Sequence, residues 1–296
     1  VKRILHDTLH LYDPVAARHI VLPFLSAVFL IFFFYSVKRH GDELKGLIAV
    51  GFLLSFPYYW GYSFNNLKDI PLLIFFSLTL MAFVEWDYTR KLRFLYGFFI
   101  LWGCTLSIKI YAFLVPVLLI LWLLIRPQRK GQGGSIPWLQ LALHVLLGFS
   151  LAVAIVLVLY APAFWIVEDK WSFFQFWRDR LKEITWGQHN PFNLHPFIQV
   201  FFRTPVLVLL FAMLGIFKAL KDYGKSPLYS LLLLWLFLPM AIICLPGTLI
   251  YHNGMRHFIV FLVPLCLLAM IGLVAGAGFI ADRIKADSKM ILRGGA

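Results

Sequence analysis

A short polar segment, Asn65 to Pro71, lies between two apolar stretches and carries the side chains best suited to chemistry. Asp69 can cap the helix predicted to begin near Pro71, because a capping carboxylate accepts amide hydrogens and proline suits a first helical turn. A cap needs one acceptor and no cation, so Lys68 and Asn66 indicate a further role. The positive end of that helix together with Lys68 predicts a site for a phosphate or a carboxylate group.

Two more segments place cations at the same predicted face. Lys109 interrupts the apolar stretch 94–125, which is too long for one membrane crossing and predicts two short helices that meet there. The last polar connection offers the planar fork of Arg256 to phosphate oxygens, flanked by the imidazoles of His252 and His257. Alternatively, Lys109 reaches lipid headgroups with its amine, and Arg256 binds a headgroup at a polar helix start.

The elements that must position these residues are membrane helices. The 296-residue chain is 61% hydrophobic and 14% charged, with a mean hydropathy of +0.82, which a water-soluble domain of this size does not need. Its apolar runs are continuous rather than alternating, so helices rather than a barrel are predicted. The formal charge of +13 comes from basic clusters between these runs, which indicates membrane orientation rather than nucleic-acid binding. The three cysteines lie in separate apolar runs and indicate neither a disulfide nor a thiolate metal site.

The whole chain, 1–296, is predicted to form a single bundle of about nine transmembrane helices. Every second connection is basic, which by the positive-inside rule places those connections in the cytoplasm and Lys68, Lys109 and Arg256 on the other side. Glycines in the segment 272–278 favour close helix packing. The predicted spans are 19–37, 46–61, 70–87, 94–108, 110–125, 138–162, 205–220, 227–246 and 258–281.

The longest outer connection, 163–204, contains apolar residues at spacings of three and four with charged residues between them. This pattern predicts an amphipathic helix on the membrane surface from Trp171 to Ile184, followed after Gly187 by an ordered loop that runs to Pro205. A structural lid over the bundle explains most of these residues, and a part in shaping the substrate site is the alternative.

With these residues in hand, the chain resembles the bacterial branch of the dolichyl-phosphate-mannose:protein mannosyltransferase family. Its members are polytopic glycosyltransferases of the GT-C class and include the aminoarabinose transferase of lipid A. The similarity covers nearly the whole chain and is strongest from Gly61 to Pro71, which is similar to the family's Asn-Pro-Lys-Asp-Ile-Pro stretch with Leu67 in place of the proline. Further family features follow in the expected order at Arg18–His19, Thr105–Lys109, Arg203–Pro205 and Gly254–Phe258.

The resemblance implies that a sugar carried on a polyprenyl phosphate passes to a hydroxyl of a protein, lipid A or an envelope glycan. The reaction would take place on the non-cytoplasmic face of a bacterial inner membrane. It needs a base for the acceptor proton, cations or a divalent metal for the departing phosphate, and an apolar groove for the isoprenoid tail. Asp69 would act as a secondary acid. The groups that bind phosphate or sugar would be Asn66, Lys68, Lys109, His252, Arg256 and His257.

One feature of the family is not matched. Its principal catalytic acid lies in the first outer loop, after one more transmembrane helix, and that region would lie upstream of Val1. Asp7 and Asp13 are on the correct side, but their surroundings do not match that motif. We therefore expect an N-terminally truncated chain without its main base. A transporter or flippase of lipid-linked sugars is the alternative function, although transporters carry ionisable groups near the midplane and here they gather at one face.

Overall fold

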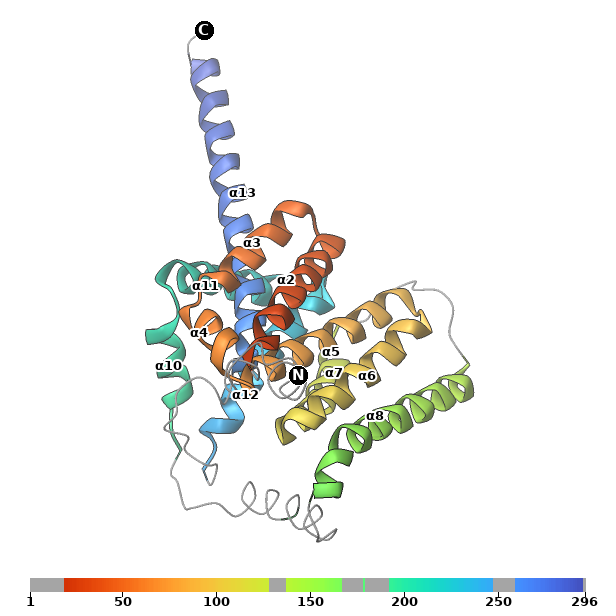
Figure 1. Ribbon diagram of the computed structural model, residues 1–296. Helices are drawn as coiled ribbons and strands as arrows, with labels where there is room; N and C mark the ends of the chain where they lie inside the picture. The colour runs from red at the N-terminus through yellow and green to blue at the C-terminus, as the bar shows by residue number, and fades with distance from the viewer. Residues whose placement is uncertain (1–18, 128–136, 167–177, 179–191, 247–258, 295–296) are drawn as a thin grey trace.

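The computed structural model describes residues 19–127, 137–166, 178, 192–246 and 259–294, and the regular elements in these residues are all helices (Figure 1). The prediction of an all-α membrane protein is confirmed. Three 3-10 turns, η2 (Ile110–Phe113), η3 (Tyr223–Lys225) and η5 (Ile259–Phe261), accompany the α-helices. These are α2 (Val21–His40), α3 (Glu43–Leu54), α4 (Pro57–Asn65), α5 (Asp69–Thr89), α6 (Leu92–Ile108), α7 (Leu114–Ile125), α8 (Trp138–Ile166), α10 (His195–Arg203), α11 (Val206–Lys221), α12 (Pro227–Cys244) and α13 (Leu262–Gly294).

Every predicted span coincides with a helical segment, but not all of these segments are of membrane length. Five helices are long and apolar enough to cross a membrane by length and composition, while the apolar helices of the region 92–125 are shorter. The number of nine transmembrane helices therefore stays a prediction. The five segments are Val21–His40, Asp69–Thr89, Trp138–Tyr160, Pro227–Cys244 and Ile259–Ile284.

The predicted span 46–61 is not one helix. It breaks between α3 and α4, where the Ser55 hydroxyl donates to the carbonyl oxygen of Phe52 at 2.6 Å. Phe56 is extended, and Pro57 occupies the first turn of α4. A residue before proline avoids the helical region, which explains why the helix stops here and a new one begins.

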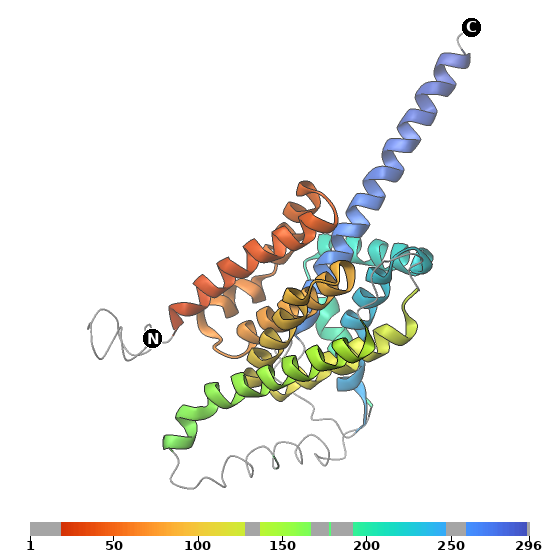
Figure 2. The same ribbon diagram turned by 90° about the vertical axis from the view of Figure 1, so that its right-hand side faces the viewer.

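α5 is the central helix of the bundle and is buried on almost all sides. Its residues Ile70, Ile74, Phe76 and Leu80 have no exposed surface, and it packs against α2, α4, α6 and η5. The ring centroid of Phe76 also lies 6.2 Å from that of Trp235 in α12. In contrast, α8 lies along the outside of the bundle next to α6 (Figure 2), and most of its large apolar side chains are exposed, as expected of a helix that faces lipid.

The crossing of α11 and α13 depends on two glycines. A Cβ atom on Gly215 would lie 1.8 Å from the carbonyl oxygen of Leu268, and one on Gly272 would lie 1.9 Å from the carbonyl oxygen of Phe211. Only glycine lets the two backbones approach this closely. The predicted close packing is thus confirmed at Gly272, whereas a Cβ on Gly278 would meet nothing within 4 Å.

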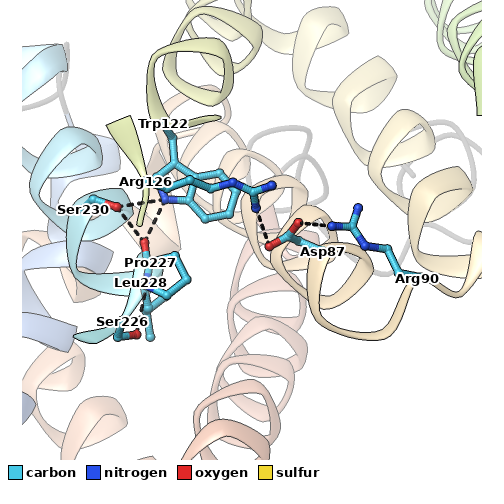
Figure 3. Close-up of polar contacts among 8 residues, drawn as sticks. All are labelled: Asp87, Arg90, Trp122, Arg126, Ser226, Pro227, Leu228 and Ser230. Carbon is cyan, nitrogen blue, oxygen red and sulfur yellow. Dashed lines mark hydrogen bonds and ion pairs between the residues drawn. The ribbon is translucent and has the colours of Figure 1, made fainter. Parts of the chain in front are cut away.

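The α2–α3, α5–α6 and α11–α12 connections meet beside the end of α7 at one end of the bundle, which we call the basic end. Here the carboxylate of Asp87, 1% exposed, accepts a hydrogen bond from Arg90 at 3.0 Å and forms an ion pair with Arg126 at 2.6 Å (Figure 3). Glu85, another buried carboxylate at this end, pairs with Arg39 at 3.2 Å and with His40 at 2.8 Å.

Trp122 joins α7 to the start of α12 at the same end. Its indole N–H donates to the carbonyl oxygen of Pro227 at 2.8 Å and lies 3.1 Å from the hydroxyl oxygen of Ser230 (Figure 3). The guanidinium of Arg126 lies over the Trp122 ring, 5.0 Å from its centroid. Asp87, Arg126 and Trp122 therefore form one continuous set of contacts from α5 through α7 to α12.

Removal of the Asp87 carboxylate is expected to destabilise the bundle. Asp87→Ala leaves Arg90 and Arg126 without their shared partner, and breaking a buried ion pair costs roughly 3 kcal/mol or more. The measurement is thermal unfolding of the purified protein in detergent. Asp42→Ala is the control, because Asp42 pairs with Lys45 on the surface and its loss should cost only about 1 kcal/mol. Equal losses in the two variants would contradict the role given to Asp87.

Candidate active site

The turn between α4 and α5 is held by Asn66. Its side-chain oxygen accepts the backbone N–H groups of Lys68 at 3.1 Å and Asp69 at 2.8 Å, so it satisfies two amides at the start of α5 that have no partner within the helix. Its side-chain nitrogen donates to the Asp69 carboxylate at 2.6 Å. Asn66 therefore fixes both the backbone and the acidic side chain of the first turn.

Asp69 is the first residue of α5 and does not cap it. The predicted capping role is wrong, because the Asp69 carboxylate contacts the side chains of Asn66 and Lys109, while the backbone N–H of Leu72 donates to the carbonyl oxygen of Lys68 at 3.1 Å. The Asp69 side chain is 4% exposed, and its second oxygen forms an ion pair with the ammonium group of Lys109. A buried carboxylate with two strong donors is thus presented at the end of the bundle opposite to the basic end, which we call the Asp69 end.

Lys109 lies at the predicted chain reversal. α6 ends at Ile108 and η2 begins at Ile110, so Lys109 is the single extended residue between them. Its backbone N–H donates to the carbonyl oxygen of Thr105 at 3.3 Å. Its side chain is 25% exposed and pairs with Asp69, so the structure joins two residues that lie 40 positions apart.

Lys68 adds a second cation one residue before α5. Its side chain is exposed and forms no ion pair with any other residue that the structure describes. A lysine in this position, beside the positive end of a helix, attracts an anion. The Asp69 end therefore combines a neutral buried ion pair with an adjacent cation that is available to a ligand.

Tyr111, in η2, is a candidate that the sequence prediction missed. Its hydroxyl is buried and has no hydrogen-bond partner in the part of the chain that the structure describes. Leaving such a group unpaired is costly, so this hydroxyl is a candidate contact for a bound substrate. The available signal was its position two residues after Lys109, at the predicted reversal.

The described residues do not form a metal site. Within them, no group of three His, Cys, Asp or Glu side chains is placed to hold a metal ion. Both carboxylate oxygens of Asp69 are already engaged, by Asn66 and Lys109. Among the described residues, Asp69 belongs to no three-ligand cluster that could hold a divalent cation, and the ammonium group of Lys109 beside it would repel one.

The other predicted binding groups, His252, Arg256 and His257, lie outside the described residues, as does most of the predicted amphipathic helix of 163–204. The structure differs from the prediction in one described part of the connection 163–204. Residues 195–203 were predicted as loop but form α10, which starts with proline in its first turn. At its end the guanidinium of Arg203 donates to the hydroxyl of Tyr58 and lies over its ring, 5.1 Å from the centroid, which ties α10 to α4.

Comparison with known families decides the affiliation of the chain. The sequence model of the family described as dolichyl-phosphate-mannose-protein mannosyltransferase matches residues 15–162, half of the chain. The chain belongs to this family. The segment of this chain that matches the mannosyltransferase family contains Asn66, Lys68, Asp69 and Lys109, whereas residues 252–257 lie outside that segment.

The fold of this family member is similar to the crystal structure of ArnT from Cupriavidus metallidurans bound to undecaprenyl phosphate. The TM-score is 0.68 at 14% sequence identity, and the similarity covers 97% of this chain and 52% of ArnT. The chain therefore spans about half the length of that protein. A comparison with curated proteins gave no match. The predicted affiliation with the GT-C glycosyltransferases is confirmed.

Proposed function

We propose that the protein is a membrane glycosyltransferase that moves a sugar from a polyprenyl phosphate to an acceptor hydroxyl at the Asp69 end. The observation that carries this proposal is the buried Asp69–Lys109 pair beside the exposed Lys68, inside the segment that matches the mannosyltransferase family. ArnT, which shares the fold, was crystallised with undecaprenyl phosphate. A protein, lipid A or an envelope glycan would supply the acceptor hydroxyl, on the non-cytoplasmic face of a bacterial inner membrane.

Lys68 and Lys109 are assigned to the donor phosphate. Breaking the bond between the sugar and the phosphate leaves its electron pair on a phosphate oxygen, so cations near that oxygen stabilise the transition state. Lys68 is exposed and Lys109 is partly so, and an ammonium group has three donors. Lys109 can thus contact the phosphate while it keeps Asp69. Arg256, with His252 and His257, is proposed to add further contacts to the phosphate or the sugar.

Asp69 is assigned a supporting role at the acceptor. Its two oxygens accept from Asn66 and Lys109, which leaves further lone pairs for an acceptor hydroxyl. As negative charge develops on the phosphate, Lys109 is drawn toward it and Asp69 becomes a better hydrogen-bond acceptor. In this proposal Asp69 orients the hydroxyl whose oxygen attacks the sugar, as a secondary acidic residue and not as the principal base. The proton of that hydroxyl passes to the departing phosphate, which has gained the electron pair of the broken bond.

The test compares Lys68→Ala with a lysine variant at the opposite end. The protein, expressed from its own gene, is assayed in membranes for release of undecaprenyl phosphate from a panel of undecaprenyl-phosphate sugars. Loss of one charged contact predicts a fall in transfer of at least about tenfold for Lys68→Ala. Lys91→Ala, an exposed lysine at the basic end, should transfer normally. Equal activity in the two variants contradicts the assignment, and movement of the lipid-linked sugar across the membrane without its release supports the flippase alternative.

A further inference from the structure

A pocket of about 400 Å³ lies at the basic end, between α2, α5, α12 and α13. Its α5 wall is formed by Leu80 and Val84, whereas the candidate active site begins at Asp69. The axial separation between Asp69 and Leu80, the α5 residue of the pocket nearest to it, is roughly 16 Å, at 1.5 Å per helical residue. The two sites are therefore distinct, and the volume falls near the lower end of the roughly 300–1,000 Å³ that is typical of small-molecule sites.

The inner part of the pocket is apolar. Its walls include Leu80, Leu231, Leu267 and Met270, which suit a hydrocarbon chain. Trp235, which is 2% exposed, also lines the pocket.

The mouth of the pocket is polar and basic. Lys45 and Lys218 line it, with side chains 34% and 42% exposed, together with the hydroxyl-bearing residue Ser36. Each lysine already pairs with one carboxylate, Lys45 with Asp42 at 2.6 Å and Lys218 with Asp222 at 2.5 Å. The Lys45–Asp42 pair is at the surface, where such contacts are weak. Asp222 is buried, with its side chain 5% exposed, but the Lys218 ammonium group is at the surface, and each of the two ammonium groups keeps donors for a second anion.

Acidic groups around the mouth do not oppose an incoming anion. Asp222 is shared between Lys218 and Lys225, both at 2.5 Å. Glu85, on α5, is held by Arg39 and His40. Each of these carboxylates is thus neutralised by one or two cations. The mouth therefore presents lysine and hydroxyl donors to a ligand that has an anionic head and an apolar tail.

We propose that this pocket binds a lipid with a phosphate head, its phosphate between Lys45 and Lys218 and one hydrocarbon chain along Leu231 and Met270. Two sources share this chemistry, a glycerophospholipid of the surrounding membrane and a polyprenyl phosphate. The site does not depend on the proposed transfer reaction, because it lies at the other end of the bundle.

The test is photocrosslinking of the full chain in detergent with three probes that carry a diazirine in the hydrocarbon chain. They are phosphatidylglycerol, undecaprenyl phosphate and a diacylglycerol without phosphate. Mass spectrometry maps the labelled peptides, and unlabelled lipid competes to give an apparent Kd. We expect a phosphate-bearing probe to label α12 between Leu231 and Trp235 and α13 between Leu267 and Val274. The apparent Kd values of phosphatidylglycerol and undecaprenyl phosphate then show which of the two lipids binds more tightly.

Matched variants separate a built site from general lipid adhesion. Lys218→Ala should weaken binding about tenfold, as expected for loss of one charge-assisted contact, and Asp222 keeps its second partner, Lys225. Val274→Phe should block labelling, because Val274 lines the pocket. Lys221→Ala removes an exposed lysine of the same helix that does not line it and should bind as the unaltered chain does. Equal labelling by the diacylglycerol probe, or equal loss in the Lys218 and Lys221 variants, overturns the proposal.

Discussion

Gly272→Ala is expected to prevent the bundle from folding stably. The added Cβ would lie 1.9 Å from the carbonyl oxygen of Phe211 and 2.6 Å from the backbone nitrogen of Gly215. Both are backbone atoms, so no side chain can rotate away and the axes of α11 and α13 must separate. Overpacking in a well-packed core costs about 1–3 kcal/mol when side chains can adjust, and we expect the loss here to exceed that range. Size-exclusion chromatography and thermal unfolding of the solubilised protein measure it.

Two other glycines provide controls for this prediction. A Cβ on Gly276, one turn further along α13, would meet only a Leu214 methyl carbon at 4.0 Å, and one on Gly51 would meet nothing within 4 Å. Gly276→Ala should therefore be nearly neutral. Gly51→Ala should stabilise α3 by about 0.5–1 kcal/mol, because alanine has the higher helix propensity. If Gly272→Ala melts at the same temperature as Gly276→Ala, the glycine crossing does not control the stability of the bundle.

Lys109→Met is expected to abolish sugar transfer and to destabilise the protein as well. The substitution keeps the length of the side chain but leaves the Asp69 carboxylate buried with Asn66 as its remaining partner. Loss of one member of a buried ion pair costs about 3–5 kcal/mol. Thermal unfolding and the transfer assay in membranes measure the two effects separately.

A double variant distinguishes the structural effect from the functional one. Asp69→Asn removes the charge that Lys109→Met leaves unpaired, so the double variant should recover most of the lost stability, since replacing both partners of a buried pair is often nearly neutral. Transfer should stay abolished, because neither the cation nor the carboxylate is present. A double variant that is stable and active would show that the pair has only a structural function.

Helix ends and polar segments could be predicted from the sequence, but the contacts between them could not. The turn at Asn66 to Asp69 and the reversal at Lys109 both follow from charges that interrupt apolar runs. Their pairing depends on how α5 and α6 pack, which no local pattern reports. The capping prediction failed because α5 begins at Asp69, earlier than predicted, so the backbone N–H of Leu72 donates to the carbonyl oxygen of Lys68 at 3.1 Å and needs no side-chain cap.

Two helix boundaries were missed for a related reason. The break before Pro57 had a local signal, since a proline inside an apolar run ends a helix at the residue before it. Helix α10 was hidden because its short apolar pattern follows several loop-forming residues, and its position depends on distant contacts. Asn193, just before it, donates from its backbone N–H to the carbonyl oxygen of Cys244 at the end of α12, at 3.2 Å.

The charges on α5 have a consequence for the synthesis of the protein. This helix carries Asp69, Glu85 and Asp87 and has the lowest hydropathy of the five candidate spans. One of their cationic partners, Arg90, directly follows α5. The other cationic partners come from α2, α6 and α7 or from residues next to these helices. Acidic residues oppose the transfer of a lone segment from the translocon into lipid. α5 is therefore the least favourable of the five candidate spans to insert alone. Insertion as a hairpin with α6 supplies Lys109 as a partner for Asp69 at the same time.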